Sequence, residues 1–188
     1  MEQAATQDPG VSNFVPPILA MAHAEADRTD KAGLLLDEFA AKDFVLPLDT
    51  MWLSGMVAYA EAVIECRASN LAGPVFQRLR PWANQLACSG ATSAGPVSHF
   101  LGGLATVLKR YETADDYFVQ AQAFSERVSS KYFAARTNLS YGRMLLERQD
   151  RSGREKGRRL LTKARTAAAV NGYGNVERRA AAALKAPP

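Results

Sequence analysis

The stretch Ala114-Asp-Asp-Tyr-Phe118-Val-Gln-Ala121 decides the fold of this 188-residue chain. It places a small residue, a large apolar residue four positions later, and another core residue three positions after that. Residues at this spacing share one face of an α-helix. The small residue lets a second helix approach closely, and the large one fills the groove beside it. The stretch therefore predicts a helix packed tightly against a partner helix.

The same pattern occurs three more times in the chain. Its other copies are Ala32, Leu36 and Phe39; Ala72, Phe76 and Leu79; and Gly157, Leu161 and Ala164. The four copies start 40, 42 and 43 residues apart. A near-constant period of one helical hairpin is typical of an α-solenoid. The alternative is that alanine-rich amphipathic helices match so loose a pattern by chance.

The rest of the chain also has the pattern of helices. Apolar residues recur at three- and four-residue spacing, and no alternation of β-branched residues indicates a strand. We expect about nine helices and no sheet, over residues 18–27, 29–42, 50–67, 71–82, 97–109, 113–128, 131–148, 154–171 and 176–184. Residues 88–96 are expected to be a loop, and Gly172 is a natural C-terminal cap.

The predicted fold class is therefore all-α, a tetratricopeptide-like α-solenoid of four to five helical hairpins. Residues 1–15 are expected to be a flexible N-terminus, 16–184 the helical repeat domain and 185–188 a tail. The predicted core consists of Leu35, Phe39, Tyr59, Phe76, Leu79, Leu101, Leu104, Phe118, Phe124, Tyr141, Leu145, Leu161 and Ala164.

Two sets of motifs resemble known families. Leu101-Gly102 followed by Ala114-x3-Phe118 resembles the tetratricopeptide repeat consensus, although Ser98 stands where tryptophan is usual, the period exceeds 34 and the closing proline is missing. The second resemblance is carried by the stretch Ala135-Arg136-Thr-Asn-Leu-Ser-Tyr141-Gly-Arg143-Met-Leu-Leu146-Glu-Arg, together with residues 154–165 and 171–174. It is a resemblance to the helical array of large ATP-dependent regulators of actinobacterial type. These are LuxR-type (MalT-like) transcription activators and ATPase-linked nucleotide cyclases.

The second resemblance covers about residues 20–184 and includes no catalytic signature. It implies a division of labour in which an ATPase is the switch, the helical array senses or docks partners, and an output domain binds DNA or makes a cyclic nucleotide. The chain would supply the array, as a fragment, as a separately encoded remnant or as a standalone module.

Composition and charge exclude several classes of protein. No apolar run is long enough for a membrane span, and the polar N-terminus MEQAATQDPG is unlike a secretory signal. Two cysteines, Cys66 and Cys88, make no disulfide scaffold, so we expect a cytoplasmic protein with reduced thiols. The net charge of +4 is mild, but residues 111–188 hold 15 basic and 8 acidic residues.

Candidate catalytic and metal motifs are weak. Gly90 and Gly95 have the spacing of a phosphate loop, but Pro96-Val97 replaces the required Lys-Ser/Thr. His23 and His99 are 76 positions apart and have no histidine partner one helical turn away. No histidine accompanies either cysteine as a base. In each of the pairs Asp115-Asp116 and Asp37-Glu38, the two adjacent carboxylates point about 100° apart, so neither pair converges on one substrate atom. We interpret Asp115-Asp116 as helix capping. We therefore expect no enzyme, no cofactor and no metal.

The basic stretch 151–165 has two interpretations. It carries seven basic residues and one acidic residue, with Arg154, Arg158 and Arg165 near one helical stripe and Arg159 beside it. It could be a surface for nucleic acid or an acidic partner, or the solvated face of a terminal amphipathic helix. We favour the solvated face because no aromatic side chains are interleaved.

The expected function is protein–protein docking or regulatory sensing, within or beside an ATP-dependent transcriptional regulator. The residues expected to be exposed in a partner-binding groove are Trp52, Tyr59, His99, Arg136 and Arg143. Two alternatives stay open. One is a sensor that binds a small-molecule inducer between hairpins, and the other is a nucleic-acid-associated module that uses the basic C-terminal helix. No membrane partner is expected, and the chain is expected to associate with DNA only indirectly.

Overall fold

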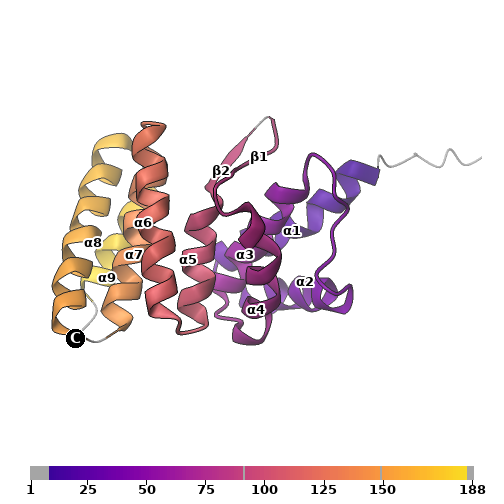
Figure 1. Ribbon diagram of the computed structural model, residues 1–188, viewed down its shortest axis with the longest axis horizontal. Helices are drawn as coiled ribbons and strands as arrows, with labels where there is room; N and C mark the ends of the chain where they lie inside the picture. The colour runs from indigo at the N-terminus through magenta and orange to yellow at the C-terminus, as the bar shows by residue number, and fades with distance from the viewer. Residues whose placement is uncertain (1–8, 91, 149, 186–188) are drawn as a thin grey trace, which may run out of the picture. The chain divides into compact units, whose positions relative to one another are not determined.

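The computed structural model describes residues 9–90, 92–148 and 150–185. Within these ranges the chain is all-α, as expected, with nine α-helices (Figure 1). They are α1 (Pro9–Glu25), α2 (Thr29–Ala41), α3 (Trp52–Glu65), α4 (Ser69–Leu79), α5 (Val97–Val107), α6 (Tyr111–Arg127), α7 (Lys131–Glu147), α8 (Arg151–Asn171) and α9 (Gly174–Lys185).

The helical region begins earlier than expected. α1 starts at Pro9, and Pro16 and Pro17 lie inside it instead of opening it. The expected start of the first helix at residue 18 is therefore wrong. Residues 1–8 of the segment expected to be flexible, and 186–188 of the expected tail, lie outside the described residues.

The expectation of no sheet is also wrong. After a 3-10 turn at Arg80–Trp82, β1 (Leu86–Cys88) and β2 (Ser93–Pro96) pair as a two-stranded sheet. Its connection is held by local contacts, because Gly90 takes a φ of +82° and the Ser89 and Thr92 hydroxyls lie 3.0 Å apart. Such a short sheet is set by its turn, so the chain shows no β-branched alternation there.

The described part of the chain divides into two compact units. Of the described residues, those up to 81 and those within 86–94 form the first unit, and those within 82–85 and 95–185 form the second. In the first unit α1 packs against α2 and α3, and α3 packs against α4. In the second unit each helix from α5 to α9 packs against the next, and α5 and α9 both contact α7.

The same three-residue link joins α1 to α2, α3 to α4 and α5 to α6. In each link the middle residue is left-handed and the last N–H donates to the carbonyl five residues earlier, which is a Schellman motif. The link from α6 to α7 repeats this geometry. The left-handed residues, with φ between 51° and 58°, are Asp27, Arg67, Lys109 and Ser129. None is glycine, so the sequence did not mark these links.

The predicted small–large pattern coincides with the second helix of each pair. All twelve of its positions, on α2, α4, α6 and α8, are buried. Of the thirteen predicted core residues, Leu35 and Phe124 are only half-buried. Leu36, next to Leu35, is the buried residue of α2.

The most extensive helix contact in the second unit is between α7 and α8, which lie side by side (Figure 1). An added Cβ at Gly142 would lie 2.9 Å from the Gly157 carbonyl oxygen, and one at Gly157 would lie 2.9 Å from that of Gly142. Neither position has room for a side chain. The small residue of the fourth pattern copy therefore sets how closely α8 docks.

Candidate functional site

The basic face of α8 is the largest charged feature that the sequence predicted. We define it as Arg151, Arg154, Arg158, Arg159, Lys163 and Arg165. All six are exposed except Arg154, which is half-buried. The opposite side of the helix is apolar and buried, through Gly153, Gly157, Leu161, Ala164 and Ala168. The amphipathic arrangement expected for α8 is therefore present.

Both ends of α8 are fixed by the local sequence. The Asp150 carboxylate accepts a hydrogen bond from the Gly153 N–H at 2.6 Å, which caps the N-terminus. Gly172 ends the helix in the left-handed conformation, with a φ of +75°, as predicted. The basic face is thus presented by a helix held at both ends.

Lys156 is not part of the basic face. It belongs to a polar cluster that was not predicted from the sequence. Its ammonium donates to the Tyr141 hydroxyl and lies 3.6 Å from the Asp115 carboxylate. The Tyr141 hydroxyl in turn donates to Asp115 at 2.5 Å. Burial, and then the hydrogen bond to Asp115, raise the pKa of Tyr141 above its ordinary value. The cluster ties α6, α7 and α8 together.

This cluster corrects the interpretation of Asp115 as a helix cap. Asp115 is the fifth residue of α6, past the first turn, and its carboxylate is engaged by Tyr141 and Lys156. The three residues lie 26 and 15 positions apart, and each has an ordinary local explanation. No local signal in the sequence points to their meeting.

Little of the charge on the basic face is compensated. Glu155 lies 3.8 Å from Arg159, but both side chains are more than 70% exposed, so the pair contributes little. Within residues 9–90, 92–148 and 150–185, no carboxylate pairs with Arg154, Arg158 or Arg165. In the part of the chain described, these three guanidinium groups have no carboxylate partner, and those of Arg158 and Arg165 are on exposed side chains.

The expected exposure of His99 is wrong. All residues of α5 are buried, and His99 is only 4% exposed. Its Nδ1 lies 3.2 Å from the Thr137 hydroxyl on α7. Burial, with the positive charges of Arg136 and Arg179, lowers the pKa of His99 well below its ordinary value. His99 is thus a neutral core residue of the second unit.

The two arginines expected in the groove lie on α7 in this same unit. Arg136 is half-buried, and its guanidinium lies over the Phe100 ring at 5.1 Å from the centroid. This is the geometry of a cation–π contact. Arg143 is exposed, two turns further along the helix. Their shared face was predicted correctly, but Arg136 is engaged with the core.

The two aromatic groove candidates lie in the first unit, on α3. Tyr59 was expected both in the core and in the groove; it is buried, so only its place in the core is confirmed. Its ring stacks on Phe39 at 3.9 Å between centroids. Burial raises the pKa of Tyr59 from 10.0 to about 12, and the charge of Glu38 adds to this. Trp52 is half-buried at the start of the helix. Only Trp52 is therefore accessible from solvent.

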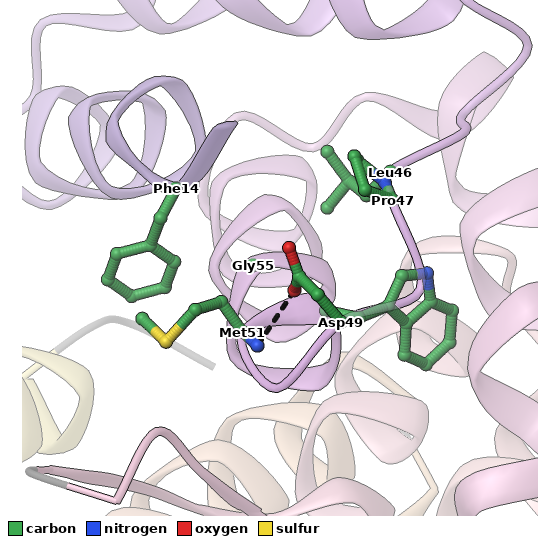
Figure 2. A pocket seen from close by; sticks show the side chains of 7 residues that line it. Phe14, Leu46, Pro47, Asp49, Met51 and Gly55 are labelled. Atoms are coloured by element: carbon green, nitrogen blue, oxygen red, sulfur yellow. Dashed lines mark hydrogen bonds between the residues drawn. The ribbon is translucent and has the colours of Figure 1, made fainter. Parts of the chain in front are cut away.

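Trp52 lines a small cleft between α1, α3 and the loop that joins α2 to α3. In Figure 2, Phe14 and Met51 lie on one side of the cleft and Leu46 and Pro47 on the other. The Asp49 carboxylate accepts the Met51 N–H at 2.8 Å at its rim. The enclosed space is about 10 Å³, which is room for about one water molecule. This cleft is too small to enclose a metabolite.

The remaining chemical candidates do not form a centre. Among the described residues, no group of three or more His, Cys, Asp or Glu could hold a metal ion. Cys66 is half-buried at the end of α3, and burial raises the pKa of its thiol, which makes it less reactive. Cys88 is exposed in the β1–β2 hairpin. Gly90 and Gly95 belong to that hairpin and not to a phosphate loop between a strand and a helix.

No family model, no curated protein and no solved structure matches this chain. None of the helices in the described part of the chain is long and apolar enough to cross a bilayer.

Proposed function

We propose that this chain is a non-enzymatic helical-repeat module that docks a protein partner. The observation that carries the proposal is the equivalence of its helix pairs. Three pairs share one link geometry, with left-handed residues 40 and 42 positions apart at Asp27, Arg67 and Lys109. Four second helices share the buried small–large pattern at nearly the same period. Repeated hairpins of this kind expose side chains for binding partners.

The finer architecture is part of this proposal. We infer that the pairs form a tetratricopeptide-like α-solenoid, because a pair that buries its pattern residues on one side needs a neighbour to cover the other. We also propose a cytoplasmic location and a role in, or beside, an ATP-dependent LuxR-type regulator. The support for that role is the resemblance of residues 135–148 and 154–165 to such arrays.

The candidate docking residues are reduced by the geometry. Tyr59 and His99 are buried, so the remaining candidate docking residues are Trp52 in the first unit and, separately, Arg136 and Arg143 in the second. The cleft beside Trp52 has room for about one water molecule, so it gives no support to a small-molecule sensor at that position. The experiment below therefore also tests whether the chain binds a small molecule instead of a protein.

The test begins with the full chain as bait in a lysate of the cells it comes from. The protein that binds to the bait is identified and then purified. Isothermal titration calorimetry then compares wild type with Trp52→Ala and Arg143→Ala, using Leu34→Ala on α2 as an exposed control. We expect saturable one-to-one binding that weakens about tenfold or more in at least one groove variant and not in the control. A partner whose affinity ignores both variants would contradict the groove. A melting temperature that rises with a metabolite, in the absence of a purified protein that binds, would replace docking by sensing.

A further inference from the structure

Three arginines of the basic face form a line along α8. Arg154 and Arg158 are one turn apart and Arg165 follows two turns later, so at 100° per residue all three fall within about 40° of one another. We call them the arginine stripe. Its length is about 16 Å, from eleven residues at 1.5 Å each. Arg158 and Arg165 are exposed and Arg154 is half-buried.

The stripe is on the flank of α8 that is turned away from α6. Lys156, which reaches Asp115 on α6, projects roughly 180° from the stripe around the helix axis. Glu155, the one acidic residue among 151–165, lies 3.8 Å from Arg159 off the stripe. The stripe is therefore a linear, uncompensated row of guanidinium groups on a helix that is capped at both ends.

The chemistry that fits this row is a matching row of carboxylates. Guanidinium binds carboxylate with two parallel hydrogen bonds, which makes arginine more selective for it than a point charge. Glutamate or aspartate at the same i, i+4, i+11 spacing on another helix would present carboxylates in line with the stripe. Nucleic acid fits less well, because α8 has no aromatic side chain on which a base could stack.

We propose that the arginine stripe of α8 docks an acidic helix of the protein partner, an inference that rests on the docking function proposed above. The pairs would be solvent-exposed, so each contributes modestly, and specificity comes from their alignment along the helix. The stripe lies about 80° around the helix from the buried side of α8. Arg158 and Arg165 are exposed, so replacing these two leaves the packing of the helix intact.

The probe is a fluorescein-labelled alanine-rich helical peptide with glutamates on one stripe, at i, i+4, i+7 and i+11. Its control is a peptide of the same composition with the glutamates spread around the helix. Fluorescence anisotropy at low salt compares the wild-type chain with Arg158→Gln/Arg165→Gln on the stripe and Arg159→Gln/Lys163→Gln off it. Both double variants remove two exposed charges. Circular dichroism confirms that both fold.

We expect the on-stripe double variant to weaken binding of the striped peptide by about fivefold or more, and the off-stripe variant by about twofold or less. The spread peptide should bind several-fold more weakly to wild type. Equal losses in both variants, or equal binding of both peptides, would mean unspecific charge attraction and overturn the proposal. Tighter binding of a short DNA duplex, lost in the on-stripe variant, would assign the stripe to nucleic acid instead. If neither peptide binds but the purified partner does, the stripe proposal fails while the docking function stands.

Discussion

Replacing Gly157 with alanine tests the packing that defines the fourth helix pair. Gly157 lies on α8 where the helix meets α7, and an alanine Cβ would lie 2.9 Å from the Gly142 carbonyl oxygen and 3.1 Å from the Leu145 Cβ. Ordinary contact begins at 3.4 Å, so the overlap with the backbone oxygen is 0.5 Å. Backbone atoms cannot rotate away as a side chain would, so the two helices must separate.

Two effects of opposite sign set the magnitude. Overpacking of a close helix contact costs about 1 to 3 kcal/mol, whereas glycine to alanine within a helix contributes about 1 kcal/mol of stability. We therefore expect Gly157→Ala to destabilise the protein by up to about 2 kcal/mol, a fall in melting temperature of up to about 8 °C for a chain of this length. Gly33→Ala on α2 is the matched control, because a Cβ there meets nothing within 4 Å. It should gain about 0.5 to 1 kcal/mol.

Urea unfolding followed by circular dichroism measures the two variants against wild type. Hydrogen exchange locates the effect, and faster exchange in Gly157→Ala should be confined to peptides from α7 and α8 and absent from α2. If Gly157→Ala stabilises the protein as much as Gly33→Ala does, the close α7–α8 contact is wrong, and with it the packing role given to the small residue of the pattern.

Three further predictions concern titration and helix ends. Because the pKa of Tyr59 is raised from 10.0 to about 12, the unfolded chain loses its phenol proton first; stability should fall between pH 10 and 12, and less steeply in Tyr59→Phe, as read from urea midpoints. Because the pKa of His99 is held well below 6.5, the unfolded chain takes up a proton first as the pH falls below 6.5, so stability should decline there, and His99→Asn should flatten that slope. Lys109 and Gly172 both follow helix ends and both have a positive φ. Lys109→Gly should therefore leave stability unchanged or raise it by up to about 1 kcal/mol, whereas Gly172→Ala should lower it by about 1 kcal/mol. Thermal melts in which both variants lower, or both raise, the melting temperature would contradict the left-handed links.

Helix existence and the buried positions of the second helices could be predicted from the sequence, because both depend on periodicity within one helix. The pattern of Ala114, Phe118 and Ala121 needs only a 3.6-residue turn and a partner helix of unspecified identity. The links could not be predicted in the same way. Asp27 and Arg67 occupy left-handed positions where glycine would have been the signal, and the hydrogen bonds of the helix end outweigh that preference.

The exposure of the groove residues could not be predicted from the helices that carry them. A helical wheel indicates which residues share a face, but not whether a second layer covers that face. The helices α3 and α5 are covered almost all round, so Tyr59 and His99 are buried and do not line an exposed groove. Arg143, on the less enclosed α7, is exposed as expected.

By itself the sequence determined an all-α chain with a small–large period near 40 and a basic C-terminal helix, since these depend on neighbours within a few turns. The tertiary structure alone decided that Asp115, Tyr141 and Lys156 meet, that His99 is buried beside Thr137, and that the stripe of α8 keeps its charges uncompensated in the described part of the chain. Burial and charge pairing are set by helices that are distant in the sequence and close in space, and local periodicity carries no information about those distances.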